Sequence, residues 1–147
     1  MAEYMVQRFV EAFGDVDVIL APGDAIAHGL APDHDEESPD WLTIKENLEA
    51  SAAVLKKYFP NTMVLWSVGN NDGYHNQAPD EAQKSTYFNF LYDLWITGYP
   101  GNASIAASAK ETFLSAGYYR ADLSDTISVL LFENEYMHND NDTSFQA

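Results

Sequence analysis

Two short apolar runs decide the fold: residues 16–21, VDVILA, which end at Pro22-Gly23, and residues 63–68, MVLWSV, which end at Gly69. The first run is rich in β-branched residues, and both runs stop at a turn signal. Each therefore predicts a strand buried in a sheet, feeding a tight loop.

An amphipathic helix is expected between these two strands. Apolar residues recur every three or four positions from Trp41 to Phe59, after a Ser38-Pro39 pair that is typical of a helix start. A strand, a helix and a second strand in this order predict a βαβ unit with parallel strands and a right-handed crossover. The predicted fold class is α/β.

Further elements flank this unit. A helix is expected before it, stopping at Gly14, and a helix with an aromatic core-facing side is expected after Pro79. The stretch 103–115 fits a short helix or a loop, and a hairpin should turn at Ser124-Asp125. The expected ranges are 2–13 and 80–97 for the helices and 118–123 and 127–133 for the hairpin strands, with a polar tail over 137–147.

Charge and composition exclude several classes of function. The 147 residues carry 7 Lys and Arg against 23 Asp and Glu, a formal charge of −16, whereas nucleic acids and anionic membranes attract basic surfaces. No apolar run approaches the ~20 residues of a transmembrane helix. Without cysteine there are no disulfides, thiolate zinc sites or cysteine nucleophiles. We also expect no signal peptide, because the first residues lack a basic start and a continuous apolar stretch.

Polar loops follow both predicted strands. Asp24 and His28 follow the first strand, and Asn70 and His75 follow the second. Neighbouring parallel strands lie about 4.8 Å apart, so Asp24 and Asn70 can approach one point. Carboxylate and amide oxygens bind hard cations, and imidazoles suit zinc and iron. The pair of loops therefore predicts part of a metal site, although either loop alone is also typical of an ordinary turn.

The spacing of these residues resembles a known family. Gly23-Asp24-x-x-x-His28 followed by Gly69-Asn70-x-Asp72 is similar to the calcineurin-like metallophosphoesterases, and most similar to their acid sphingomyelinase-like branch, which includes endopolyphosphatases. Residues 87–91 and 111–120 resemble the same branch, so the likeness covers about residues 15–136. It implies that residues 1–136 form the central part of a calcineurin-like phosphoesterase domain.

The resemblance implies a two-metal phosphoesterase that uses divalent ions, typically zinc. By position in the motif, Asp24 matches the carboxylate that bridges both metals, and Asn70 matches the amide ligand of the second. His28 matches a histidine near the scissile phosphate. Asn71 stands where the family has a loop histidine, which leaves His75 as its candidate substitute. The substrate would be a phosphate ester (a lipid such as sphingomyelin, a polyphosphate or a nucleotide), in a secreted or a lysosomal or vacuolar protein.

The chain also departs from the family pattern. The Asp-x-His segment expected upstream and the Gly-His-x-His segment expected downstream are both missing. We therefore expect an incomplete fragment that is inactive on its own. The alternatives are a non-catalytic binding or regulatory relative that has lost the metal site, and an acidic cation-binding module unrelated to phosphate chemistry. Sequons at Asn102 and Asn141 hint at a secreted glycoprotein ancestor.

Overall fold

The computed structural model describes residues 2–27, 39–73, 78–79, 81–133 and 135–137, and over these residues it is a mixed α/β structure. Strand β1 (Val18–Ala21) pairs in parallel with β2 (Met63–Trp66), and helix α2 (Pro39–Tyr58) connects them along the chain. The register places Leu20 opposite Leu65 and Ala21 opposite Trp66. The predicted strand, helix and parallel strand are confirmed.

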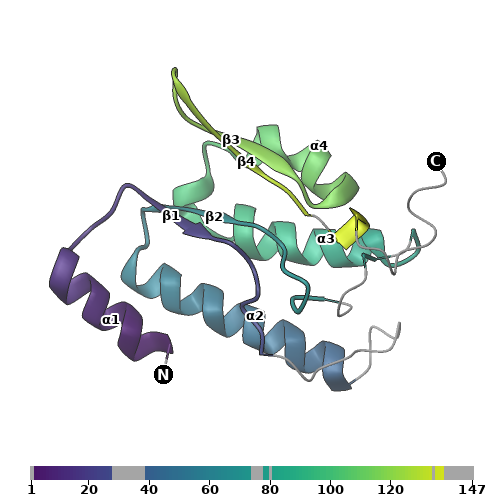
Figure 1. Ribbon diagram of the computed structural model, residues 1–147, viewed down its shortest axis with the longest axis horizontal. Coiled ribbons are helices and arrows are strands. Elements are labelled where there is room, and N and C mark those ends of the chain that lie inside the picture. The colour runs from purple at the N-terminus through teal and green to yellow at the C-terminus, as the bar shows by residue number, and fades with distance from the viewer. Residues whose placement is uncertain (1, 28–38, 74–77, 80, 134, 138–147) are drawn as a thin grey trace.

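The elements form layers around this strand pair (Figure 1). Helices α2 and α3 (Lys84–Tyr92) run on one side of it, and the antiparallel hairpin of β3 (Tyr119–Ser124) and β4 (Ile127–Leu131) lies on the other. Helix α1 (Ala2–Phe13) packs on α2, and α4 (Ala106–Ala116) contacts both α3 and β3. The predicted N-terminal helix and the predicted hairpin are therefore confirmed, and the stretch after residue 103 is a helix.

Helix α2 forms as its apolar spacing predicts. Trp41, Ile44 and Leu48 lie one turn apart and are completely or almost completely buried. Lys56 and Lys57 occupy the last turn, where positive charge interacts favourably with the helix dipole. The helix thus turns one apolar face to the core and ends close to the start of β2.

The helix after Pro79 differs from its predicted form. It begins at Lys84, because residues 81–83 form a turn, and it ends in a π-helical turn, η1 (Asp93–Thr97). The N–H of Gly98 donates to the carbonyl of Asp93 at 2.7 Å, five residues back. Two successive side chains, Trp95 and Ile96, are fully buried in this wide turn. A short 3-10 turn, η2 (Pro100–Asn102), then leads to α4.

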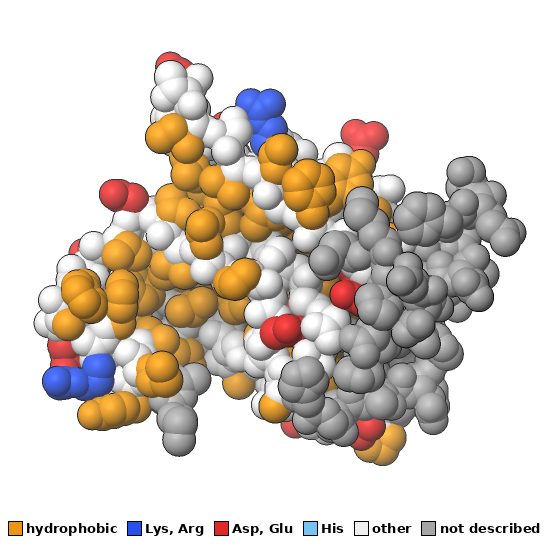
Figure 2. All heavy atoms as spheres, in the orientation of Figure 1, with side chains coloured by type: hydrophobic (Ala, Val, Ile, Leu, Met, Phe, Trp, Pro, Cys, Tyr) orange, Lys and Arg blue, Asp and Glu red, His pale blue; other side chains and the backbone are white. Residues whose placement is uncertain are grey.

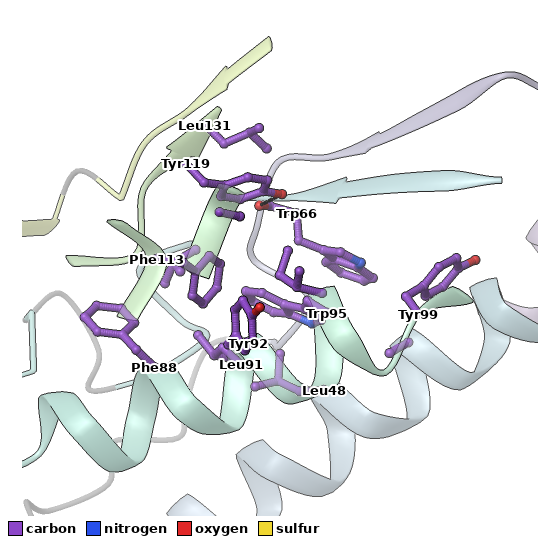
Figure 3. Close-up of a cluster of buried hydrophobic side chains, with 14 of the residues drawn as sticks. Leu48, Trp66, Phe88, Leu91, Tyr92, Trp95, Tyr99, Phe113, Tyr119 and Leu131 are labelled. Atoms are coloured by element: carbon purple, nitrogen blue, oxygen red, sulfur yellow. Dashed lines mark hydrogen bonds between the residues drawn. The ribbon is translucent and has the colours of Figure 1, made fainter. Parts of the chain in front are cut away.

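Aromatic side chains fill the centre of the core (Figure 3). The rings of Trp66 and Trp95 stack 5.1 Å apart with nearly parallel planes, which joins β2 to η1. The hydroxyl of Tyr119 donates to the carbonyl of Trp66 at 2.8 Å, which joins β3 to the end of β2. Phe88 and Phe113 pack edge to face between α3 and α4. The predicted core role of the aromatic helix is confirmed.

Asn102, one of the two sequon asparagines, is part of this core. Its side chain accepts from the N–H of Val64 at 2.9 Å and donates to the carbonyls of Val64 and Trp95 at 2.6 and 2.8 Å. The residue is completely buried. The folded chain therefore offers this amide no position for a glycan, and its role here is to link β2 to η1. The sequon at Asn141 lies outside the described residues.

The first strand is not buried as the sequence predicts. Leu20 in β1 is 62% exposed, whereas its partner Leu65 in β2 is fully buried. In the described part of the chain, β1 pairs with β2 alone and is therefore an edge strand.

Among the described helices, none combines the length and the apolar character needed to cross a bilayer.

Candidate metal-binding site

The loops after β1 and β2 meet backbone to backbone at the carboxyl ends of the two strands. Gly23 has a φ of +89°, and a Cβ there would lie 2.5 Å from the amide nitrogen of Gly69. A Cβ on Gly69 would in turn lie 2.5 Å from Oδ1 of Asp24. Only glycine fits at these two positions, because any side chain would push the loops apart.

The Asp72 carboxylate ties the two loops together. Oδ2 accepts the N–H groups of Asp24 and Gly69, each at 2.9 Å, and Oδ1 accepts the N–H of Ala25 at 2.8 Å. Asp72 is completely buried. Its two oxygens thus connect residues 47 and 48 positions earlier in the chain with the loop that carries Asp72 itself.

Asp24 presents its side chain from a strained backbone. Its φ of +54° is the only positive φ among the described residues other than glycine. Oδ1 of Asp24 accepts from both the backbone N–H and the side-chain amide of Asn71, each at 3.1 Å. Asp24 is exposed whereas Asn71 is buried, so the second loop holds the carboxylate while leaving it accessible to solvent.

The two aspartates therefore have different electrostatic surroundings. Burial raises the pKa of Asp72, the three backbone N–H donors oppose that rise, and the nearby Asp24 carboxylate adds to it. Asp72 is turned toward backbone N–H groups, so it positions the loops rather than facing a ligand. Asp24 is the carboxylate of this pair that can contact a cation from solvent.

The other predicted site residues are placed unequally. Asn70 is half-buried and lies between Gly69 and Asn71, both of which approach Oδ1 of Asp24. The structure thus brings the loop of Asn70 to the Asp24 carboxylate. His28 and His75 lie outside the described residues. Within the described ranges, no three Asp, Glu, His or Cys side chains gather in a way that would hold an ion.

The donor set decides what this junction can hold. The exposed Asp24 carboxylate and the Asn70 amide are oxygen donors, which suit a divalent cation. Two protein oxygens leave most of the coordination shell to water, so such an ion would be weakly held. The oxygen donors at this junction are therefore of the kind that suits a largely hydrated divalent cation.

Sequence reasoning did not find the role of Asp72 or of the Asn71 amide. Asp72 was visible as part of the Gly69-Asn70-x-Asp72 motif, but the pattern does not reveal which way a carboxylate points. The one usable signal is the pair of glycines. Loops that approach closely enough to require Gly23 and Gly69 exclude water from their backbone N–H groups, which then need a buried acceptor. Asp72 is the acid nearest in sequence to Gly69, and it lies on the same loop.

No protein-family model matches the chain.

Proposed function

We propose that Asp24 and Asn70 are metal ligands in a phosphodiester-hydrolysing site of the calcineurin-like type, of which this chain supplies a part. We further propose that the fold is a partial metallophosphoesterase domain and that the substrates are phosphodiesters such as sphingomyelin. The observation that supports it best is the Asp72 carboxylate, which accepts three N–H groups from both strand-end loops. A rigid junction of this kind is what a metal site needs to keep its ligands in place.

The residues of the loop junction would divide into those that fix the backbone and those that bind the metal. Asp72 and the two glycines fix the loop backbones, and Asn71 fixes the plane of the Asp24 carboxylate through Oδ1. Asp24 and Asn70 would then hold divalent metal ions, of which zinc is the one that the family resemblance implies. When bound, such ions lower the pKa of a coordinated water and neutralise a phosphate ester. We assign His28 and His75 to phosphate contact and leaving-group protonation on sequence position alone.

A divalent cation is also what the charge of the molecule requires. A net charge of −16 repels a phosphate ester, and the described junction contains carboxylates and amides but no cationic side chain. Metal ions would supply positive charge where the substrate has to bind. We therefore expect phosphate binding to depend on added metal.

One observation favours the alternative of a non-catalytic relative. Oδ1 of Asp24 already accepts two N–H groups from Asn71, and a carboxylate oxygen has two lone pairs. A carboxylate that bridges two metals needs both of its oxygens. Binding of two metals by Asp24 therefore requires the Asn71 side chain to turn away. A non-catalytic relative without metals needs no such movement.

Manganese binding followed by electron paramagnetic resonance tests the proposal. We expect one weak site whose affinity falls about tenfold or more in Asp24→Asn and in Asn70→Ala, because each loses a ligand. Asp125→Asn, at the exposed hairpin turn, is the matched control and should bind as the original chain does. Binding that survives both ligand substitutions would instead indicate an unrelated acidic cation-binding module.

Hydrolysis of bis(p-nitrophenyl) phosphate tests whether the chain is catalytic on its own. We expect no activity above a metal-only blank, because the described ligands form only part of a site. Activity that is lost in Asp24→Ala would show that the chain is catalytically complete. Manganese binding without hydrolysis is the result expected of a partial or non-catalytic site.

A further inference from the structure

A shallow apolar groove lies between the two sheets. Its floor includes Leu20 and Leu65 from the parallel pair, and its wall includes Leu130 and Phe132 at the end of the hairpin. The groove has a volume of about 340 Å³. Leu20, Leu130 and Phe132 are each at least 60% exposed. Figure 2 shows apolar side chains gathered over this side of the molecule, from α1 to the hairpin.

The groove runs beside an unfilled strand edge. In the described part of the chain β1 pairs on one side with β2, so alternate N–H and C=O groups of residues 18–21 face outward. Parallel strands are normally covered on both faces, and an isolated pair of strands is marginal. β4 likewise pairs with β3 alone among the described strands. Backbone groups and apolar side chains therefore border the same space.

Acidic residues stand at both ends of this edge. Asp15 and Asp17 precede β1 and are exposed, and the exposed Asp24 follows it. None of the residues that line the groove is charged. A ligand lying along β1 of the metal-free chain would therefore have an apolar middle and would meet negative charge at each end.

We propose that this groove binds an extended segment of a partner protein, with apolar side chains at alternate positions and Lys or Arg at both ends. Added as a strand beside β1, the segment would pair its backbone with the outer groups of residues 18–21 and place apolar side chains next to the exposed Leu20. Strand addition of this kind takes its affinity from the backbone and its selectivity from pockets for alternate side chains.

A second copy of the chain fits the same groove poorly. Each copy carries a charge of −16, and pairing two β1 edges would bring Asp15, Asp17 and Asp24 of both copies together. Like charges at such short range oppose association. A cationic partner instead gains from the same charges, and its binding weakens as salt is added.

Peptide binding tests this proposal, with fluorescence anisotropy as the readout. The probe is a peptide of alternating valine and threonine flanked by two lysines at each end. One control peptide has glutamates in place of the lysines, and another has a central proline that removes a backbone donor. We expect the lysine peptide to bind at least about tenfold more tightly than either control.

Substitutions in the protein locate the binding surface. Leu20→Ser should weaken binding of the lysine peptide about tenfold or more, whereas Leu42→Ser, at an exposed leucine on α2, should leave it unchanged. Both positions are exposed, so both variants should fold. Three results would overturn the proposal: no binding of the lysine peptide, equal loss in the two variants, or sedimentation as a dimer that Leu20→Ser dissociates.

Discussion

Asp72 and Glu133 are both buried carboxylates, yet they differ in what they hold together. Asp72 accepts N–H groups from a loop almost 50 residues away, whereas Glu133 accepts the N–H of Glu135, at 2.8 Å, in its own turn. Burial raises the pKa of both groups, and raises that of Glu133 to about 7. A buried carboxylate can therefore hold together a long-range junction or a local turn, and its N–H donors decide which.

Replacing Asp72 should have the largest effect. Asp72→Ala leaves three N–H groups without their acceptor at a buried junction, which should lower the free energy of unfolding by about 3–5 kcal/mol. Urea denaturation measures the loss. Asp72→Asn keeps one acceptor oxygen and should lose about half as much.

Glu133→Gln is the matched comparison at neutral pH. Its acceptor oxygen can still take the N–H of Glu135, and the neutral amide avoids the cost of a buried charge, so we expect the free energy of unfolding to stay the same or to rise by up to about 2 kcal/mol. A loss in Glu133→Gln equal to that in Asp72→Asn would show that the contrast between a junction and a local turn is wrong.

Gly69 at the loop junction and Gly117 beside Glu133 allow the same two regions to be compared by adding a Cβ atom. A Cβ on Gly69 would meet the backbone and carboxylate of Asp24, whereas one on Gly117 would meet the side chains of Phe88, at 2.8 Å, and Glu133, at 3.0 Å. Side chains can move aside, but the loop backbone cannot. We therefore expect Gly69→Ala to cost about 3 kcal/mol and Gly117→Ala, with its φ of +69°, about 1–2 kcal/mol.

Thermal unfolding measures the loss of stability in both variants. Gly14→Ala measures separately what a positive φ costs an alanine. Gly14 has a φ of +73°, but no heavy atom lies within 4 Å of the position that a Cβ would take there. Its substitution therefore tests conformation without a clash. Gly14→Ala therefore matches Gly117→Ala in φ, whereas Gly69 has no positive φ and its loss comes from the contact. A Gly69→Ala loss close to zero would show that the loop contact contributes nothing.

Much of the fold could be predicted because the spacing of apolar residues along the sequence indicates which face of each element is buried. The spacing of Trp41, Ile44 and Leu48 specifies the buried face of α2, and the two apolar runs specify the parallel pair. The exposure of Leu20 could not be predicted, because burial of a strand depends on what lies beside it. The π-helical turn at residues 93–97 was equally hidden, since no local pattern marks a hydrogen bond to the fifth residue back.

The candidate site was less predictable than the fold. Sequence placed Asp24 and Asn70 at neighbouring strand ends, and their loops do meet. It could not show that Asp72 faces inward to three N–H groups or that Asn71 contacts Oδ1 of Asp24. Buried Glu133 had no signal at all, because a single acid after a strand is typical of a solvated residue.

Ionisation of the buried Glu133 carboxyl group should make the stability of the protein depend on pH. Because burial raises the pKa of Glu133 to about 7, the unfolded chain ionises first as pH rises from about 4.5. Stability supported by the protonated group is present below pH 4.5 and lost as pH rises through 7. After allowance for partial solvation, this loss should be about 2 kcal/mol.

Urea midpoints measured from about pH 4.5 to about pH 7.5 test this expectation. Glu133→Gln should remove that part of the pH dependence, whereas Glu111→Gln, at an exposed position on α4, should retain it. A pH profile unchanged by Glu133→Gln would mean that this carboxyl group ionises alike in the folded and unfolded chains.

Removing the Asn71 side chain should have the smallest effect on stability and the most informative effect on metal binding. Asn71→Ala loses one 3.1 Å hydrogen bond to Oδ1 of Asp24, worth about 1 kcal/mol. Without this hydrogen bond the Asp24 carboxylate is less firmly oriented, so manganese affinity should fall by up to about fivefold. Asn89→Ala, which removes exposed side-chain hydrogen bonds on α3, is the control and should leave metal affinity unchanged. A rise in affinity would instead show that Asn71 competes with the ion for Oδ1, and the junction would then favour a non-catalytic relative over a preorganised metal site.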